Sequence, residues 1–324
     1  CTLGGILATN ASGLLRMTFG TARDIVIGLR VVQADGTIVK SGGKVVKNVA
    51  GYDLNKMYIG SLGTLGIMAE ITLKLQPLPE IGHIIIGLLP SISTVMDTAF
   101  KLLESDVMPT FIELANPVLI ALLSRQVGGN SVDAGFPIIA GIMGQEETVK
   151  WQVEACERLF QEMGAGQIVH MEDERYQIAL KLLRSFPTGQ VVSSDMMSGI
   201  TCRASVTPEQ IENLYQLAEN RCQKSSMGCG MLAHFSSGHM SFVFYQEVPF
   251  EEPHLDILAG IINDLQQAAV ESGGSLVVEH APAALKSRVE VWGPARDDLP
   301  IMRMLKNKLD PKGILNNCRF IGGI

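Results

Sequence analysis

Three equally spaced glycines, Gly60, Gly63 and Gly66, constrain the fold of this chain more than any other feature of its sequence. They lie in GSLGTLGI (60–67), which predicts a tight turn that leads into a strand. One face of this strand is predicted to carry Ile67, Ala69, Ile71, Leu73 and Leu75. Since glycine has no Cβ, the backbone N–H groups of such a turn can reach phosphate or ring oxygens. The alternative is a plain turn made of small residues.

A second stretch of small residues, TLGGILATNASG (2–13), precedes this turn in the sequence. We expect it to form a loop in which Asn10 and Ser12 can cap backbone groups. The segment between the two stretches, 25–40, alternates apolar and polar residues on both sides of a central DG pair. Because glycine tolerates positive φ, this pair predicts the turn of a β-hairpin.

The order of these motifs resembles the FAD-binding domain of the flavoprotein superfamily that contains vanillyl-alcohol oxidase and p-cresol methylhydroxylase. The matching segments are TLGGILATNASG, FGTARD, the hairpin, GGKVVKNVAGYDL (42–54) and GSLGTLGI. Residues 45–67 look most like the FAD-binding subunits of bacterial glycolate oxidases. A closing motif, LKNKLDPKGILNNCRF (305–320), resembles the end of FAD-linked oxidases. The resemblance is close over 1–80, good over 290–324 and present only in outline between them.

The resemblance implies an α+β fold class, in which the second part of a p-cresol methylhydroxylase-type FAD-binding domain is followed by a ferredoxin-like FAD-linked oxidase cap domain. We expect the partial FAD-binding domain at 1–80, the cap or substrate domain at 81–290, and a helix and tail that return to the FAD domain at 291–324. Beyond Pro79, strands and helices alternate and fit two antiparallel sheets with helices on one face. Because the chain starts at Cys1, inside the TLGG motif, we expect a fragment that lacks the family's upstream subdomain.

FAD is the cofactor that the resemblance implies, and Asn10 and Ser12 become candidates for hydrogen bonds to the flavin ring. The expected cofactor-binding residues are Thr2, Gly4, Gly5, Thr9, Asn10, Ala11, Ser12, Gly63, Thr64, Leu65, Gly66 and Ile67. A nicotinamide dehydrogenase is disfavoured. The sequence has no GxGxxG that follows a strand, opens a helix and precedes an acidic residue by about 20 positions.

Transfer of a hydride from a 2-hydroxy acid to a flavin requires a cation for the carboxylate and a base for the hydroxyl proton. Arg203 is the predicted cation, because strand alternation places it with Thr201 and Ser205 on a polar face. The alternative is a solvent-facing arginine on an antiparallel sheet. Arg288 and Arg319 are weaker candidates.

His280 and His234 are the predicted bases. The pair Glu279-His280 ends an apolar strand and resembles an EHG-type segment of related FAD-linked dehydrogenases, although a surface or capping role is the alternative. In those relatives two histidines seven residues apart hold a divalent metal with the glutamate. His234 matches the first histidine, but Ser241 stands in place of the second, and His239 is expected on the opposite face of the strand. We therefore predict no bound metal.

Composition narrows the classes of partner. A net charge of −7 and the lack of a basic stripe argue against nucleic-acid binding. Mean hydropathy is positive, yet no apolar run approaches the roughly 18 to 20 residues that a membrane-spanning helix needs. The six cysteines form no CxxC pair, so any iron–sulfur cluster must belong to another chain, and a reducing compartment is favoured.

These observations together predict an FAD-dependent, glycolate oxidase-like subunit that oxidises a small 2-hydroxy acid, glycolate or D-lactate, to the 2-oxo acid. An iron–sulfur subunit is expected to receive the electrons, and a related flavoprotein subunit is expected beside it. We expect a cytoplasmic location, with partner subunits able to hold the chain at the inner face of the membrane. The alternative is a non-catalytic FAD-binding or structural subunit of such a complex.

Overall fold

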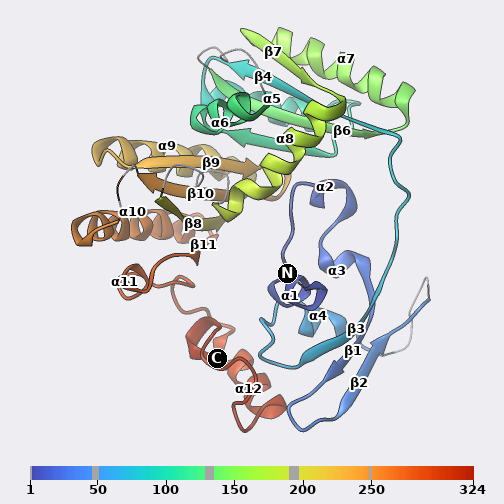
Figure 1. The fold of residues 1–324 in the computed structure, drawn as a ribbon, viewed down its shortest axis with the longest axis vertical. Coiled ribbons are helices and arrows are strands. Elements are labelled where there is room, and N and C mark those ends of the chain that lie inside the picture. The colour runs from blue at the N-terminus through green and yellow to red at the C-terminus, as the bar shows by residue number, and fades with distance from the viewer. Residues whose placement is uncertain (1, 46–50, 128–134, 190–196, 247, 249) are drawn as a thin grey trace. The chain divides into compact units, whose positions relative to one another are not determined.

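The computed structural model describes residues 2–45, 51–127, 135–189, 197–246, 248 and 250–324. The chain divides into two compact units (Figure 1). Unit 1 consists of Cys1–Leu78 and Pro294–Ile324, and unit 2 consists of Pro79–Gly293. Residues 46–50 of the GGKVVKNVAGYDL motif lie outside the described residues.

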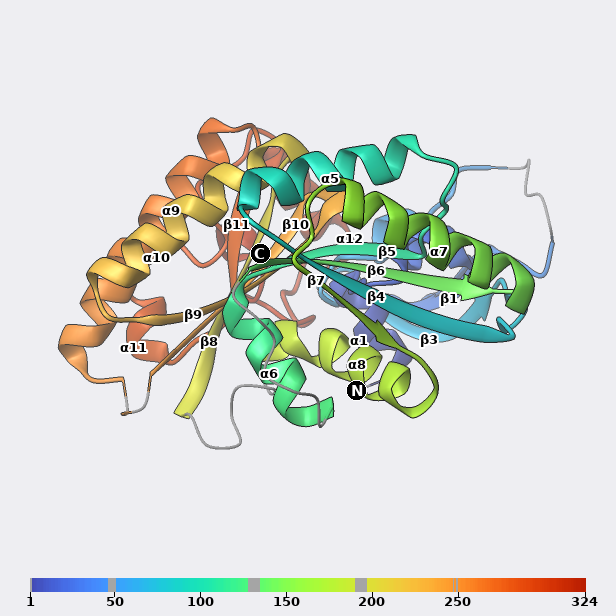
Figure 2. The same cartoon turned by 90° about the horizontal axis from the view of Figure 1, so that it is seen from above.

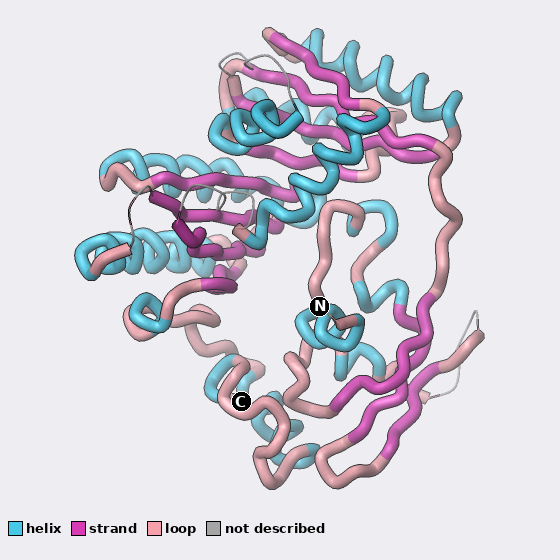
Figure 3. Tube along the Cα trace, in the orientation of Figure 1, coloured by secondary structure: helices cyan, strands magenta, loops and turns pink. Residues whose placement is uncertain are grey.

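Unit 1 is built on a three-stranded antiparallel sheet with the strand order β2-β1-β3. The strands are β1 (Val26–Val32), β2 (Ile38–Gly42) and β3 (Ile67–Leu73). Strands β1 and β2 form the predicted hairpin, and Gly36 in its turn has the positive φ, +84°, that the DG pair supplies. Figure 3 shows the three strands together and marks both ends of the chain in this unit.

Unit 1 also contains the helices α1 (Leu3–Thr9), α2 (Arg16–Phe19), α3 (Ala22–Ile25), α4 (Asn55–Tyr58) and α12 (Leu299–Leu309) and the 3₁₀ turn η4 (Ile321–Gly323). The expectation that 2–13 is a loop is wrong, because Thr2 caps a helix. Its Oγ1 accepts the N–H of Gly5 at 3.1 Å. Asn10 then ends the helix in a left-handed conformation, with φ 49°. The predicted helix before the closing motif is confirmed by α12.

The predicted core face of β3 is wrong in part, because the pairing of β3 with β1 shifts register between Arg30 and Val31. Such a bulge moves the alternation of side chains by one residue. Ile67 is therefore 59% exposed, whereas Met68 packs against the core together with Ile71. The buried members of that core are Leu7, Ala22, Val26, Leu29, Val31, Tyr58, Ile59 and Leu65.

Unit 2 contains one eight-stranded antiparallel sheet with the order β11-β8-β10-β9-β5-β6-β4-β7. Its strands are β4 (Ile81–Leu89), β5 (Phe111–Ala115), β6 (Phe136–Gly144), β7 (Gln167–Met171), β8 (Met197–Ser205), β9 (Gly228–His234), β10 (His239–Gln246) and β11 (Ser275–His280). The prediction of two separate sheets is wrong, because β5 pairs with β9 and joins the halves.

Helices cover both faces of this sheet. The helices of unit 2 are α5 (Ile92–Glu104), α6 (Pro117–Val127), α7 (Glu146–Glu162), α8 (Asp173–Ser185), α9 (Ile211–Lys224), α10 (Glu252–Glu271) and α11 (Ala283–Lys286), with 3₁₀ turns η1 (Phe186–Thr188), η2 (Pro208–Gln210) and η3 (Phe235–Ser237). Figure 2 shows α5, α7, α9 and α10 on one face and α6 and α8 on the other.

Two glycines of β4 support this arrangement, because an odd separation puts them on opposite faces. Tyr176 of α8 lies against Gly82, and Phe160 of α7 lies against Gly87. The expectation of helices on one face is therefore wrong for the sheet as a whole. A strand as fully buried as β4 needs apolar cover on both sides.

Candidate functional site

The two stretches of small residues in unit 1 meet in space. The N–H of Gly60 donates to the carbonyl of Leu7 at 2.9 Å, and the N–H of Leu62 donates to the carbonyl of Ala8 at 2.8 Å. The end of α1 and the glycine turn (60–66) are therefore held together by backbone hydrogen bonds. Residues predicted from two distant motifs belong to one local structure.

This structure leaves polar groups and space for a ligand. Gly63 has φ +73°, and a Cβ added there would meet nothing within 4 Å. Over the residues that the structure describes, the N–H groups of Gly63 and Leu65 have no protein acceptor. Among the described residues, the buried Oδ1 of Asn10 has no hydrogen-bond partner, and the Asn10 side chain lies against Gly60. Backbone amides without an acceptor suit the oxygens of an anionic cofactor, and the amide oxygen of Asn10 can accept a hydrogen bond from a donor group.

Other predicted residues of the turn have structural roles. A Cβ on Gly66 would lie 2.5 Å from Cγ1 of Val31, so this glycine is required by core packing. Thr64 is 1% exposed, and its Oγ1 donates to the carbonyl of Ser61 at 2.7 Å. Leu65 belongs to the core through its side chain, so only its backbone is available to a ligand.

In the first stretch, residues 2–13, polar side chains form hydrogen bonds within and just after α1. The Thr9 hydroxyl donates to the carbonyl of Gly5 at 3.0 Å, and Ser12 Oγ accepts a hydrogen bond from Arg16 at 3.1 Å. Among the predicted cofactor-binding residues of this stretch, Thr2, Gly5, Thr9 and Ala11 are exposed, and Gly4, Asn10 and Ser12 are partly buried.

Sequence reasoning missed a buried pair of charged residues, Lys306 and Asp310, of which Lys306 touches this turn. Lys306 and Asp310 are 6% and 3% exposed, and Lys306 Nζ donates to the carbonyl of Thr64 at 3.0 Å. Their spacing of four residues on a helix usually indicates a solvent-exposed ion pair. The apolar residues next to them in the sequence are the signal that could have predicted their burial.

In unit 2, Arg203 lies at the edge of the sheet that β8 and β11 form. Its guanidinium is 2.9 Å from the Glu279 carboxylate, and the side chains are 32% and 33% exposed. The predicted alternation is confirmed for its neighbours Cys202 and Ala204, which are buried. His280, next to Glu279, is exposed. Arg203 and His280 lie on the adjacent strands β8 and β11, where the cross-strand partner of His280 is Thr201. The roles of Arg203 as the cation and of His280 as the base stay predictions.

His234 occupies a different environment. Its side chain is 8% exposed, and Nδ1 pairs with the carboxylate of Glu113, which is 2% exposed. The other ring nitrogen lies 3.3 Å from the hydroxyl of Ser236. Burial raises the pKa of Glu113, although His234 opposes this shift. Glu113 was not predicted, because it lies in an apolar strand and pairs with His234 only where the two halves of the sheet join.

The expected position of His239 is wrong. His239 is the direct cross-strand partner of His234, because the chain reverses through η3 between β9 and β10. The rule that an odd offset changes face holds only within one strand. In the part of the chain that the structure describes, no three His, Cys, Asp or Glu side chains gather closely enough to hold a metal ion. No described helix is long and apolar enough to cross a membrane.

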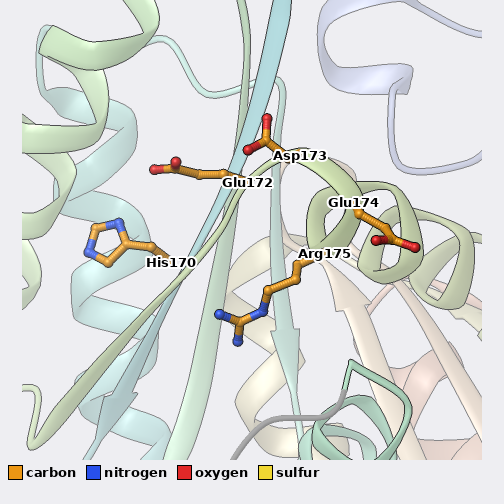
Figure 4. A pocket seen from close by; sticks show the side chains of 5 residues that line it. All are labelled: His170, Glu172, Asp173, Glu174 and Arg175. Atoms are coloured by element: carbon orange, nitrogen blue, oxygen red, sulfur yellow. The ribbon is translucent and has the colours of Figure 1, made fainter.

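A shallow pocket of about 330 Å³ lies where β7 leads into α8 (Figure 4). It is lined by His170, Glu172, Asp173, Glu174 and Arg175, none of them a predicted site residue. His170 Nδ1 is 3.1 Å from Nε2 of His83, whose pKa is lowered by burial although Glu172 opposes this shift. Three carboxylates against one guanidinium make this pocket unfavourable for a small anion.

Comparisons with known proteins agree with the division of the chain. A family model described as the C-terminal domain of FAD linked oxidases matches residues 79–320, and one described as an FAD binding domain matches residues 1–42. The chain belongs to the FAD-linked oxidase family. FAD is the cofactor that this membership supports, and the open amides of the glycine turn and the orphaned Asn10 oxygen fit it.

Curated relatives cover nearly the whole chain. A glycolate oxidase subunit of Bacillus subtilis is 27% identical over 97% of this chain and 67% of its own length. A mitochondrial D-lactate dehydrogenase (cytochrome) of Arabidopsis thaliana is 26% identical over 99% of this chain and 56% of its own length. The FAD-linked oxidase chain described here therefore spans between about half and two thirds of these relatives.

Solved structures establish the fold. The structure of p-cresol methylhydroxylase with bound substrate has a TM-score of 0.73 and 16% identity, and covers 97% of this chain and 68% of its own. A structure of alkyldihydroxyacetonephosphate synthase has a TM-score of 0.64 and 17% identity, and covers 96% of this chain and 56% of its own. The predicted α+β fold of the p-cresol methylhydroxylase type is confirmed.

Proposed function

We propose that this chain is a glycolate oxidase-like, FAD-dependent oxidoreductase subunit that oxidises a 2-hydroxy acid, glycolate or D-lactate, to the 2-oxo acid. The observation that carries the proposal is the glycine turn, where the amides of Gly63 and Leu65 have no acceptor among the described residues, the space at Gly63 is open, and the Asn10 side chain lies against Gly60. Relatives named glycolate oxidase and D-lactate dehydrogenase support the substrate class.

Bound FAD would accept the hydride from the substrate carbon. Arg203 would hold the substrate carboxylate, because a guanidinium has five N–H donors and Glu279 occupies only one side of it. His280 would take the hydroxyl proton, since its exposed imidazole follows Glu279 on the same strand.

The electrons would pass to an iron–sulfur subunit, with a related flavoprotein subunit in the same complex. The four cysteines of unit 2 are buried thiols on helices and strands, which supports a cluster on another chain. We place the subunit in the cytoplasm, in keeping with these free thiols, and associate it with the inner face of the membrane only through partners.

A non-catalytic FAD-binding or structural subunit is the second candidate. Two observations favour it: Glu279 offsets the charge of Arg203, and His234 is buried against Glu113. Under this proposal the chain would support a related flavoprotein that holds the substrate.

The test is the visible absorbance spectrum of the FAD-loaded chain, before and after anaerobic addition of glycolate or D-lactate. Bleaching of the flavin band supports the oxidase, and a flavin that binds without bleaching supports the non-catalytic subunit. If the chain binds no flavin, both the oxidase proposal and the proposal of a non-catalytic FAD-binding subunit are overturned.

A matched pair of variants tests the turn itself. Gly63→Leu should abolish flavin binding, whereas Gly36→Leu should retain it. Both glycines have positive φ, and the space that a Cβ would enter is open at both, so the two substitutions impose similar backbone strain. Equal flavin content in the two variants would remove Gly63 from the cofactor site.

A further inference from the structure

A buried ammonium group joins the C-terminal tail of unit 1 to the glycine turn. Lys306 on α12 donates from Nζ to Asp310 Oδ2 at 2.6 Å and to the carbonyl of Leu315 at 2.7 Å. Its third acceptor is the carbonyl of Thr64 at 3.0 Å. An ammonium carries three hydrogens, so each of its donors has an acceptor.

Asp310 holds this ammonium and is itself fixed by backbone donors. Its carboxylate accepts the N–H of Ile314 at 3.0 Å and the N–H of Leu315 at 2.8 Å. Burial raises the pKa of Asp310, but Lys306 and the two amides outweigh it, and the resulting pKa lies below the usual value. The carboxylate is therefore ionised at neutral pH. If the Lys306 ammonium moved away, it would leave the buried charge of Asp310 without a partner.

The tail holds a second carbonyl of the turn, because Asn316 Nδ2 donates to the carbonyl of Leu62. The carbonyls of Leu62 and Thr64 are thus both directed at the tail. In a trans peptide the C=O and the next N–H point in opposite directions. The N–H groups of Gly63 and Leu65 consequently point away from the tail, and neither of them has an acceptor among the described residues.

We propose that Lys306 is a positioning residue for the cofactor turn: by holding the Thr64 carbonyl, it directs the Leu65 amide toward bound FAD. Asn316 does the same for the Gly63 amide. The inference rests on the proposed function, because it requires FAD to bind at this turn. A general contribution to stability is the competing explanation, although apolar residues often serve stability as well as a buried ion pair does.

The test compares Lys306→Met with Lys308→Met in the full chain. Lys308 lies on the same helix and is exposed, so its substitution controls for the loss of a lysine from α12. Titration with FAD should show at least tenfold weaker binding for Lys306→Met and a change below twofold for Lys308→Met. Hydrogen exchange of the amides at 61–66 should be faster only in Lys306→Met.

A double variant separates positioning from stability. Lys306→Met with Asp310→Asn removes both charges, so its thermal midpoint should recover toward the wild-type value. The weak FAD binding should persist, because nothing then holds the Thr64 carbonyl. Recovery of FAD affinity together with stability would overturn the proposal.

Two further outcomes of the FAD titration also test the positioning role of Lys306. If the wild-type chain binds FAD and Lys306→Met binds it equally well, with unchanged exchange at 61–66, Lys306 does not position the turn. If the wild-type chain binds no FAD, the proposed function fails. In that case hydrogen exchange of the amides at 61–66 still shows whether Lys306 orders the turn. If Lys306→Met exchanges at the wild-type rate, the positioning role of Lys306 is overturned as well.

Discussion

Two ion pairs lie on the same face of the unit 2 sheet and differ in almost every other respect. Glu113 and His234 pair across the join of the two halves and are 2% and 8% exposed. Arg203 and Glu279 pair at the β8–β11 edge and are about one third exposed. Cross-strand pairing through His239 and Ser205 places both pairs on one face.

The difference in burial separates a structural pair from an available one. A buried pair has no water to replace a lost partner, so each charge depends on the other. A half-exposed pair is screened by solvent and can exchange its partner for a ligand at little cost. The sequence suggested Arg203 as the cation and His280 or His234 as the base, whereas in the structure Arg203 is accessible and His234 is buried.

The largest expected effect is on the stability of unit 2. Glu113→Ala should lower the free energy of unfolding by about 3–5 kcal/mol, because it leaves His234 buried without its partner. Glu279→Ala, the matched removal of a carboxylate from the exposed pair, should cost below about 1 kcal/mol. Denaturant unfolding followed by circular dichroism measures both. Similar losses in the two variants would contradict the distinction between the pairs.

The next effect is on substrate binding. Arg203→Met should raise KM for glycolate or D-lactate roughly 10- to 100-fold, since a hydrogen bond to a charged group contributes about 1.5–3 kcal/mol. FAD content should remain unchanged. Arg221→Met is the control, because Arg221 forms a similar surface pair with Asp264 at 3.0 Å. Steady-state kinetics decides the point, and equal KM values in the two variants would remove Arg203 from the site.

Most elements of unit 2 were predictable because burial imposes a local period on the sequence. The side chain of Ser91 caps α5, and α7 begins with two acidic residues, both of which are local signals that a sequence gives for the start of a helix. The joining of β5 to β9 was not predictable from these signals. It depends on edge pairing between segments more than a hundred residues apart, and neither strand carries a local pattern that specifies its neighbour.

The site residues show the same limit. Arg203 was predictable because its buried neighbours Cys202 and Ala204 reveal the face on which it lies. Lys306 was missed because a lysine four residues before an aspartate usually indicates an exposed helical pair. Only the fold reveals that its ammonium reaches Thr64, a residue far away in the sequence.

A smaller effect concerns pH. Burial raises the pKa of Glu113 above its usual value of 4.5, so the wild-type chain loses stability as pH rises from 4.5 through the folded-state pKa. Glu113→Gln removes this titration and keeps a side-chain oxygen for His234. The difference in unfolding free energy, wild type minus variant, should therefore decrease between pH 4.5 and neutral pH. Unfolding curves at several pH values measure it, and a difference that grows with pH would contradict the raised pKa.

The smallest effect should come from Glu279→Gln. The change removes the charge that competes with a substrate carboxylate for Arg203, so KM should fall by up to about fivefold, the equivalent of a surface ion pair of about 0.2–1 kcal/mol. Because the pair is partly exposed, the effect should shrink as salt is raised toward 1 M. A rise in KM instead would mean that Glu279 holds the guanidinium in its binding position, and the exposed pair would then resemble the buried one in depending on both of its members.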